Sequence, residues 1–253
     1  MIKKLGFIGA GNVAWHLSKA FQAQGLELIQ IWSRTQDSAD RLATEVGAEA
    51  ITKFSDMNQD IDLWIISVPD DAIETVLRNL MFIPKALVHT CGSISIEVLH
   101  GKAQQTGVLY PLQTFSKMRE VDMTEVPFCL ETESEAFFQK LRTLAQRVSN
   151  NVFSISSGQR ADLHLAAVFT CNFTNALFGI SEQLLSEKDI PVRLLHPLMK
   201  ETIEKAIEIG ARKAQTGPAL RNDQKIMNKH RKMLAQKADL EALYNLLSKI
   251  IRK

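Results

Sequence analysis

The sequence predicts an α/β protein in which a Rossmann-type doubly wound sheet is followed by a second, all-helical domain. A short apolar run at the start ends in the Gly-x-Gly-x-x-Ala stretch Gly9–Ala14 and continues into an apolar pattern of helical period. Short apolar runs then alternate with helical patterns as far as about residue 155, which is typical of a parallel sheet covered by helices. No convincing strand follows Ser157. We therefore expect a dinucleotide-binding domain at residues 1–156 and a helical domain at residues 157–253.

The glycine-rich stretch indicates a nucleotide site. Gly9 would make the tight turn, Gly11 would let the backbone approach a pyrophosphate, and Ala14 would keep the helix close to the strand. The N-terminus of that helix would face the phosphates. A glycine turn can also be purely structural, but a second strand, Glu27–Trp32, follows at the expected distance and favours the nucleotide site. The residues assigned to this part of the site are Gly9, Ala10, Gly11, Asn12 and Val13.

The end of the second predicted strand favours NADP over NAD. In NAD sites an acidic residue near this point binds the ribose hydroxyls, whereas a nearby arginine accommodates the 2′-phosphate of NADP. Here the strand runs into Ser33, Arg34 and Thr35, with no carboxylate at its end. We assign these three residues to NADP recognition. The alternative is an exposed arginine in a polar turn.

The following elements continue the alternation. A helix at Gln36–Val46, closed by Gly47, leads to a short strand at Ala48–Ile51 and to the apolar run Asp62–Val68, which is typical of a buried parallel strand. Strand ends of such sheets line the cofactor crevice, so we place Ser67, Val68 and Pro69 along the nicotinamide half. Asp70 and Asp71 are expected to cap the next helix, Ala72–Leu80.

The fifth strand, Ala86–His89, adds two polar side chains to the expected crevice. His89 is either a proton donor or a structural histidine at a strand end, and Ser93 would point the same way. Cys91 is interpreted as an ordinary half-buried cysteine. The sheet part is completed by strands at Thr106–Tyr110, Pro127–Glu131 and Asn151–Ile155 and by a helix at Ser134–Val148.

The second domain is expected to contain only helices. They are predicted at Gly158–Glu187, at Pro191–Ala214 with a possible fresh start at Pro197, from Asn222 or Asp223 to about Ala235, and at Asp239–Ile251. The first is mostly apolar and must be covered on nearly every side, which leads us to expect a homodimer through this domain.

A polar stripe interrupts the apolar long helix. At 100° per residue His164, Cys171, Asn175 and Glu182 share one line, with Asn172 at its edge. The stripe either faces substrate in an interdomain cleft or makes a satisfied helix–helix or dimer contact. Further along, Arg221 is a candidate for planar, two-point binding of a carboxylate, while Asp223 is expected to cap its helix and to leave His230 exposed.

Composition excludes several other classes of function. The 253 residues carry a net charge of +2, which gives no reason to expect a nucleic-acid or membrane-surface partner. We expect no run long enough to span a bilayer and no signal peptide, because glycines interrupt the first apolar run. The three cysteines lack disulfide or metal-ligand spacing, so we expect no metal and a reducing, cytoplasmic location.

Several motifs resemble those of a known group. The first domain resembles the NADP-binding domain of deazaflavin-dependent NADP oxidoreductases and pyrroline-5-carboxylate reductases, and the whole chain is similar to bacterial oxidoreductases that add a helical domain of unknown function. The motifs that carry the resemblance are Gly9–Ala14, Ser67–Asp70, His89–Ser93, Tyr110–Phe115, His164–Phe169 with Asn172, and Thr216–Asp223. This chain departs from many relatives in having Tyr110 in place of a histidine and Asn222 in place of a glycine.

The resemblance implies an NADP-linked oxidoreductase that is dimeric through its helical domain. Hydride would pass between nicotinamide and a small carbonyl, imine or hydroxy acid. The alternative within the same class is a reductase of a cyclic imine. The proposed substrate-site residues are His164, Asn172, Asn175 and Arg221, with His89 and Tyr110 as other possible proton donors. A different class, a redox sensor that binds NADP(H) without turnover, stays open because no acid–base residue is securely identified.

Overall fold

The computed structural model describes residues 1–252, which form two compact units. The first ends at Asn175 and the second begins at Ala176. The domain boundary predicted at residue 156 falls just after the last strand, β8 (Val152–Ser154). The division between the two units lies further along the chain. The division lies there because the beginning of the long helix packs against the sheet. Its Leu163 contacts a buried cluster that contains Tyr110 and Cys129.

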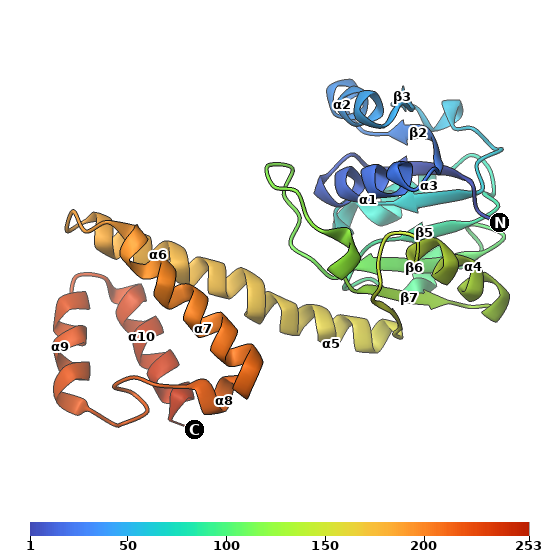
Figure 1. The fold of residues 1–253 in the computed structure, drawn as a ribbon. Helices are drawn as coiled ribbons and strands as arrows, with labels where there is room; N and C mark the ends of the chain where they lie inside the picture. Colours follow the sequence, from blue (N-terminus) through green and yellow to red (C-terminus); the bar gives the residue numbers. More distant parts are fainter. Residues whose placement is uncertain (253) are drawn as a thin grey trace. The chain divides into compact units, whose positions relative to one another are not determined.

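The first unit is built on the predicted doubly wound sheet (Figure 1). Its eight strands lie in the order β3-β2-β1-β4-β5-β6-β7-β8. Neighbouring strands are parallel except for β6 and β7, which are antiparallel. The other strands are β1 (Lys4–Ile8), β2 (Glu27–Trp32), β3 (Glu49–Ile51), β4 (Leu63–Ile66), β5 (Leu87–His89), β6 (Thr106–Pro111) and β7 (Phe128–Thr132).

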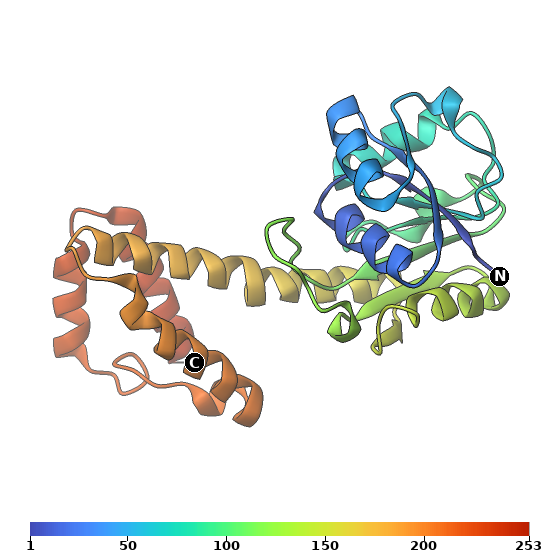
Figure 2. The same cartoon turned by 45° about the horizontal axis from the view of Figure 1, so that its top comes forward.

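Helices cover both faces of this sheet because its central strands are apolar on both sides. On β4, Leu63 and Ile65 face one core cluster while Trp64 and Ile66 face the other, as the two-residue period of a strand requires. The first cluster includes residues of α1 (Asn12–Ala23), α2 (Gln36–Val46) and α4 (Glu135–Ala145). The second includes residues of α3 (Ile73–Asn79). Figure 2 shows the same layers from a second direction.

The long helix of the prediction is present but is not uniform. It consists of α5 (Ser157–Ala167), a π-helical segment, η5 (Val168–Phe173), and α6 (Thr174–Ser186). Ser156 and Gln159 form a capping box that fixes its start. A π-helical turn contains more residues than an α-helical turn, so positions on either side of η5 no longer follow a single 100° spacing.

The second unit contains helices and no strand among its described residues. They are most of α6, followed by η6 (Val192–Leu195), α7 (His196–Ile209), α8 (Ala211–Ala214), α9 (Gln224–Leu234) and α10 (Ala238–Ile251). Pro197 lies in the first turn of α7, as predicted, but the single helix expected to reach Ala214 is wrong because Gly210 interrupts it with a φ of 86°. Asp223 caps α9, as expected, by accepting a hydrogen bond from the Ile226 N–H at 3.1 Å.

One helix meets the length and hydropathy of a membrane span. Within residues 1–252, Ser157–Ser186 is long and apolar enough by these two criteria alone. The expectation that no such segment exists is therefore wrong. One polar side chain near its start contacts the sheet: Arg160 is buried and forms an ion pair with Glu131 of β7. The start of the helix thus packs against the sheet of the first unit.

Candidate active site

A groove of about 670 Å³ lies at the carboxyl ends of β1, β2 and β4; we call it the glycine groove. Three turns form it, and they are the three that the sequence assigns to a dinucleotide. They contribute Gly9, Ala10 and Gly11, then Ser33, Arg34 and Thr35, and then Ser67, Val68 and Pro69. The remaining lining residues are Trp32, Ser38, Asp71, Ala72, Thr75 and Val76.

The β1–α1 turn has the geometry of a phosphate cradle. Gly9 adopts a φ of 115°, and a Cβ at this position would lie 2.1 Å from the carbonyl oxygen of Ser67, so only glycine fits. Gly11 is the N-cap of α1, and no side chain caps this helix. The backbone N–H groups of its first turn therefore lack side-chain partners and are suited to an anion at the helix N-terminus.

The side chains of Asn12 and Val13 do not line the glycine groove. Asn12 donates a hydrogen bond to the carbonyl oxygen of Phe115 at 3.0 Å, and Val13 packs against the core. Lys117 extends the same contact: its ammonium donates to the carbonyl oxygen of Ala10 at 3.0 Å. The loop after β6 is thus held against the glycine turn, which the sequence did not indicate.

A second hollow, of about 480 Å³, has two polar rings in its lining, those of Tyr110 and His164; we call it the Tyr110 hollow. The Tyr110 hydroxyl lies 3.1 Å from Nδ1 of His164, and the rings meet edge to face. Burial raises the pKa of Tyr110 to about 12, so its phenol stays protonated at neutral pH. The other lining residues are Leu112, Gln113, Thr114, Leu163, Ala166, Ala167, Val168, Thr170, Cys171 and Asn172.

The turn after β5 lies between the two cavities. The Cys91 thiol is 3.8 Å from the carbonyl oxygen of Val68 in the glycine groove. A Cβ on the next residue, Gly92, would lie 2.6 Å from Nδ1 of His164, so the backbone itself packs against the imidazole. Burial raises the pKa of Cys91, and the thiol is therefore no nucleophile at neutral pH.

Asp70 has a different role from the one predicted. Neither it nor Asp71 caps α3, whose N-cap is Ala72 and lacks a side-chain hydrogen bond. Asp70 instead accepts a short hydrogen bond from the hydroxyl of Ser93 and so ties the end of β4 to the turn after β5. The prediction failed because a short 3₁₀ segment, η2 (Asp70–Ala72), separates the strand from α3.

A buried arginine holds this turn in place. Arg160 of α5 donates to the carbonyl oxygens of Cys91 and Ile94 and forms an ion pair with Glu131. Its side chain is only 1% exposed. Burial alone would raise the pKa of Glu131, but hydrogen bonds from Arg160 and Ser157 outweigh it and lower the pKa. Sequence reasoning missed this group, although an arginine near the start of an apolar helix is a usable signal.

His89 is a poor candidate for proton transfer. It is fully buried, and its Nδ1 accepts a hydrogen bond from the Cys91 N–H at 3.2 Å. Nε2 has no hydrogen-bond partner among residues 1–252. Burial lowers the pKa of His89 to about 4, which keeps the ring neutral at physiological pH. This geometry is that of a structural histidine.

The predicted polar stripe is only partly assembled. His164, Cys171 and Asn172 line the Tyr110 hollow, whereas Asn175 is outside the lining set. The predicted alignment of His164 with Asn175 assumed an unbroken α-helix, and the π-helical segment η5 changes it. π-Helical turns occur frequently at functional sites.

Arg221 lies in the second unit, in the turn before α9, and its side chain is exposed. The adjacent Asn222 adopts a left-handed φ of 53°, a conformation that asparagine tolerates better than most residues. His230, expected to be exposed, is half-buried and hydrogen-bonds the Tyr244 hydroxyl at 3.0 Å.

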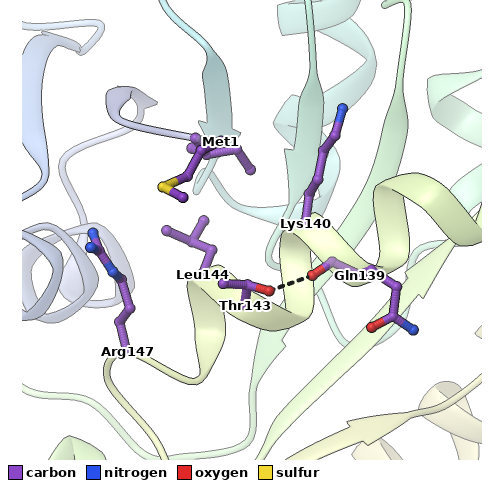
Figure 3. A pocket seen from close by; sticks show the side chains of 7 residues that line it. Met1, Gln139, Lys140, Thr143, Leu144 and Arg147 are labelled. Atoms are coloured by element: carbon purple, nitrogen blue, oxygen red, sulfur yellow. Dashed lines mark hydrogen bonds between the residues drawn. The ribbon is translucent and has the colours of Figure 1, made fainter.

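Another hollow lies at the opposite ends of the strands. Met1 and Ile2, which precede β1, line it together with residues of α4 (Figure 3). Thr143 donates to the carbonyl oxygen of Gln139 there, which is an ordinary contact within the helix. Because ligands of open α/β sheets bind at the carboxyl ends of the strands, this hollow is not the cofactor site.

Comparisons with known proteins agree with this geometry. A family profile described as NADP oxidoreductase, coenzyme F420-dependent, matches residues 4–91, and a domain of unknown function, DUF2520, matches residues 126–251. The structure of a protein from Bacteroides fragilis, described as a putative NADP oxidoreductase, is 40% identical, with a TM-score of 0.95 over 99% of this chain and 98% of that one. The chain belongs to the family of that protein. This is the oxidoreductase group that the resemblance indicated.

More distant structures share the fold. An imine reductase from Myxococcus stipitatus in complex with NADP⁺ is 19% identical, with a TM-score of 0.68 over 98% of this chain and 93% of that one. A 1-pyrroline-5-carboxylate reductase from Streptococcus pyogenes is 15% identical, with a TM-score of 0.65 over 98% of both chains. A glucose-fructose oxidoreductase domain-containing protein from Xenopus tropicalis is 28% identical over 96 residues, which is 37% of this chain but only 25% of that protein.

Proposed function

We propose that this protein is an NADP(H)-dependent oxidoreductase that reduces or oxidises a small carbonyl, imine or hydroxy acid. The observation that carries the proposal is a turn of the first unit that contacts one lining residue of each cavity. The turn Cys91–Gly92 contacts Val68 in the glycine groove on one side and His164 in the Tyr110 hollow on the other. Bound nicotinamide dinucleotide would supply or accept the hydride.

The glycine groove fits NADP in three places. The uncapped first turn of α1 offers backbone N–H groups to the diphosphate. Ser33, Arg34 and Thr35 offer two hydroxyls and a guanidinium to the 2′-phosphate. Ser67, Val68 and Pro69 adjoin the turn that separates the groove from the Tyr110 hollow, which suits the nicotinamide half.

The Tyr110 hollow supplies the proton chemistry. In reduction, the substrate carbon gains the hydride, the C=O or C=N π electrons move to the heteroatom, and the heteroatom takes a proton. Tyr110 and His164 share a hydrogen bond, so His164 can donate the proton to the substrate heteroatom while the Tyr110 hydroxyl orients the imidazole. In the alternative, the phenol of Tyr110 donates the proton directly. Asn172 is proposed to orient the substrate heteroatom from the same hollow.

The proposal is tested by following NADPH absorbance at 340 nm with a panel of small ketones, cyclic imines and hydroxy acids. Steady, substrate-dependent oxidation of NADPH, or its formation from NADP⁺ with a hydroxy acid, is the expected result. Tight NADPH binding without turnover across the panel would contradict the proposal. It would favour the redox sensor instead.

We also propose that the protein is a cytoplasmic homodimer. Leu165, Phe169 and Phe173 follow one another at intervals of four residues along the long helix and are at least half exposed. Contiguous exposed apolar side chains usually mark an interface. Sedimentation at micromolar concentration should give about twice the chain mass of 28.4 kDa; a monomer would contradict this proposal. Recovery of the native protein in a soluble cell extract tests the location, and recovery with membranes would contradict it.

A further inference from the structure

One wall of the glycine groove is formed by the segment that follows β4. Asp71 and Ala72 of η2 and Thr75 and Val76 of α3 line the groove there. Asp71 precedes Thr75 by four residues, and Ala72 precedes Val76 by the same number, a spacing that brings side chains to one side of a helical segment. The wall therefore offers a small aliphatic surface with a polar edge beside it.

Both polar side chains of this wall have hydrogen-bonding capacity left. The oxygen of the Thr75 hydroxyl accepts a hydrogen bond from Arg78 at 3.1 Å, and within residues 1–252 its proton has no acceptor. The exposed carboxylate of Asp71 can only accept, and in the same part of the chain no donor or cation pairs with it. The edge of the wall thus presents one acceptor and one donor.

The purine base of a bound NADP(H) belongs in this part of the groove. Strands β2 and β4 are the two neighbours of β1, so the turn with Arg34 and the segment after β4 flank the glycine turn. The base is joined to the ribose whose 2′-phosphate we assign to Arg34. Val68, which contacts the turn after β5, lies toward the nicotinamide half. The adenosine half is therefore left to the space between Arg34 and the η2–α3 wall.

We propose that Asp71 and Thr75 read the base of the cofactor and that Asp71 makes the site selective for a 6-aminopurine. The Asp71 carboxylate accepts a hydrogen bond from the exocyclic amino group, and the Thr75 hydroxyl donates to a ring nitrogen. The flat face of the ring packs on Ala72 and Val76. A 6-oxopurine would instead turn a carbonyl oxygen toward the carboxylate, and two acceptors cannot pair. The inference rests on the proposed function and adds which atoms of the cofactor the chain distinguishes.

The test is a calorimetric titration of the full-length protein with NADPH and with its hypoxanthine analogue, in which a carbonyl replaces the 6-amino group. Asp71→Asn keeps the shape of the side chain, but its amide can donate to a carbonyl oxygen as well as accept from an amino group. Thr75→Val removes the hydroxyl alone. Glu74→Gln is the matched control, because Glu74 is a neighbouring exposed carboxylate that pairs with Arg78 and does not line the groove.

The readout is the ratio of the two dissociation constants, because a general effect of the Asp71 charge on the anionic cofactor changes both by the same factor. We expect the native protein to bind NADPH about tenfold more tightly than the analogue, as for one hydrogen bond to a charged group. The ratio should fall to near one in Asp71→Asn and stay native in Glu74→Gln. Thr75→Val should weaken NADPH binding roughly threefold to tenfold.

A native ratio near one, or a native ratio retained in Asp71→Asn, would overturn the selectivity, and unchanged NADPH binding in Thr75→Val would overturn the role of its hydroxyl. The measurement needs binding and no turnover. A protein that binds NADPH with the expected ratios but turns over no substrate would contradict the proposed function and support this inference. A protein that binds neither nucleotide would overturn both.

Discussion

Replacement of Gly92 by alanine tests the contact between the turn after β5 and the His164 ring. The new Cβ would lie 2.6 Å from Nδ1 and 2.7 Å from Cγ of the imidazole. The ring must retreat by about 0.8 Å to reach the 3.4 Å of ordinary contact, and this breaks its 3.1 Å hydrogen bond with Tyr110. Overpacking and the lost hydrogen bond together should lower the free energy of unfolding by about 2–4 kcal/mol.

Urea unfolding measures this loss, and the imidazole ¹⁵N resonances of His164 report the hydrogen bond directly. Gly158→Ala is the control, because a Cβ there meets no atom within 4 Å. We expect the control to keep the native stability and the native His164 signals. Gly92→Ala with native stability and an unshifted His164 spectrum would refute the proposed packing.

Three further variants test separate parts of the account. Arg160→Met leaves the Glu131 carboxylate without its cation and should cost about 3–5 kcal/mol in urea unfolding, and a loss below 1 kcal/mol would contradict the buried ion pair. His89 has a folded-state pKa near 4, below its usual 6.5. Its contribution to the free energy of unfolding is therefore complete above pH 6.5 and is lost as the pH falls toward 4. Between pH 7 and pH 4.5 the free energy of unfolding should therefore fall more steeply in the native protein than in His89→Asn. His164→Ala should keep NADPH affinity while turnover of an accepted substrate falls roughly 10²–10⁴-fold, and native turnover would move the proton donor to Tyr110.

The glycine groove was predictable because each of its parts is local in sequence. Gly9 and Gly11 form a motif with a fixed spacing, and the turns that contain Arg34 and Ser67 each directly follow an apolar strand. Parallel strands bring such turns to one edge of the sheet, so the strand order alone assembles them. His164 was predicted as a site residue on other grounds: it is polar on an apolar helix, and it lies in one of the motifs that carry the family resemblance.

The Tyr110 hollow and its support were only partly predictable. The Arg160–Glu131 pair joins residues 29 positions apart, and nothing in a single sequence pairs them. The π-helical segment also has no clear sequence signal, and an assumed period of 3.6 residues placed Asn175 beside His164. Asp70 was predicted to cap the following helix, because an acidic residue directly before a helix usually caps it. In the structure it hydrogen-bonds Ser93 instead.

Cofactor titration of the native protein and of Arg34→Ala tests the central claim most directly. We expect NADPH to bind roughly tenfold to a hundredfold more tightly than NADH, because the Arg34 guanidinium can form charge-assisted hydrogen bonds with the 2′-phosphate. In Arg34→Ala the affinity for NADPH should fall to near that for NADH, with little change for NADH itself. Equal affinities of the native protein for the two cofactors, or an unchanged NADPH preference in Arg34→Ala, would contradict the account.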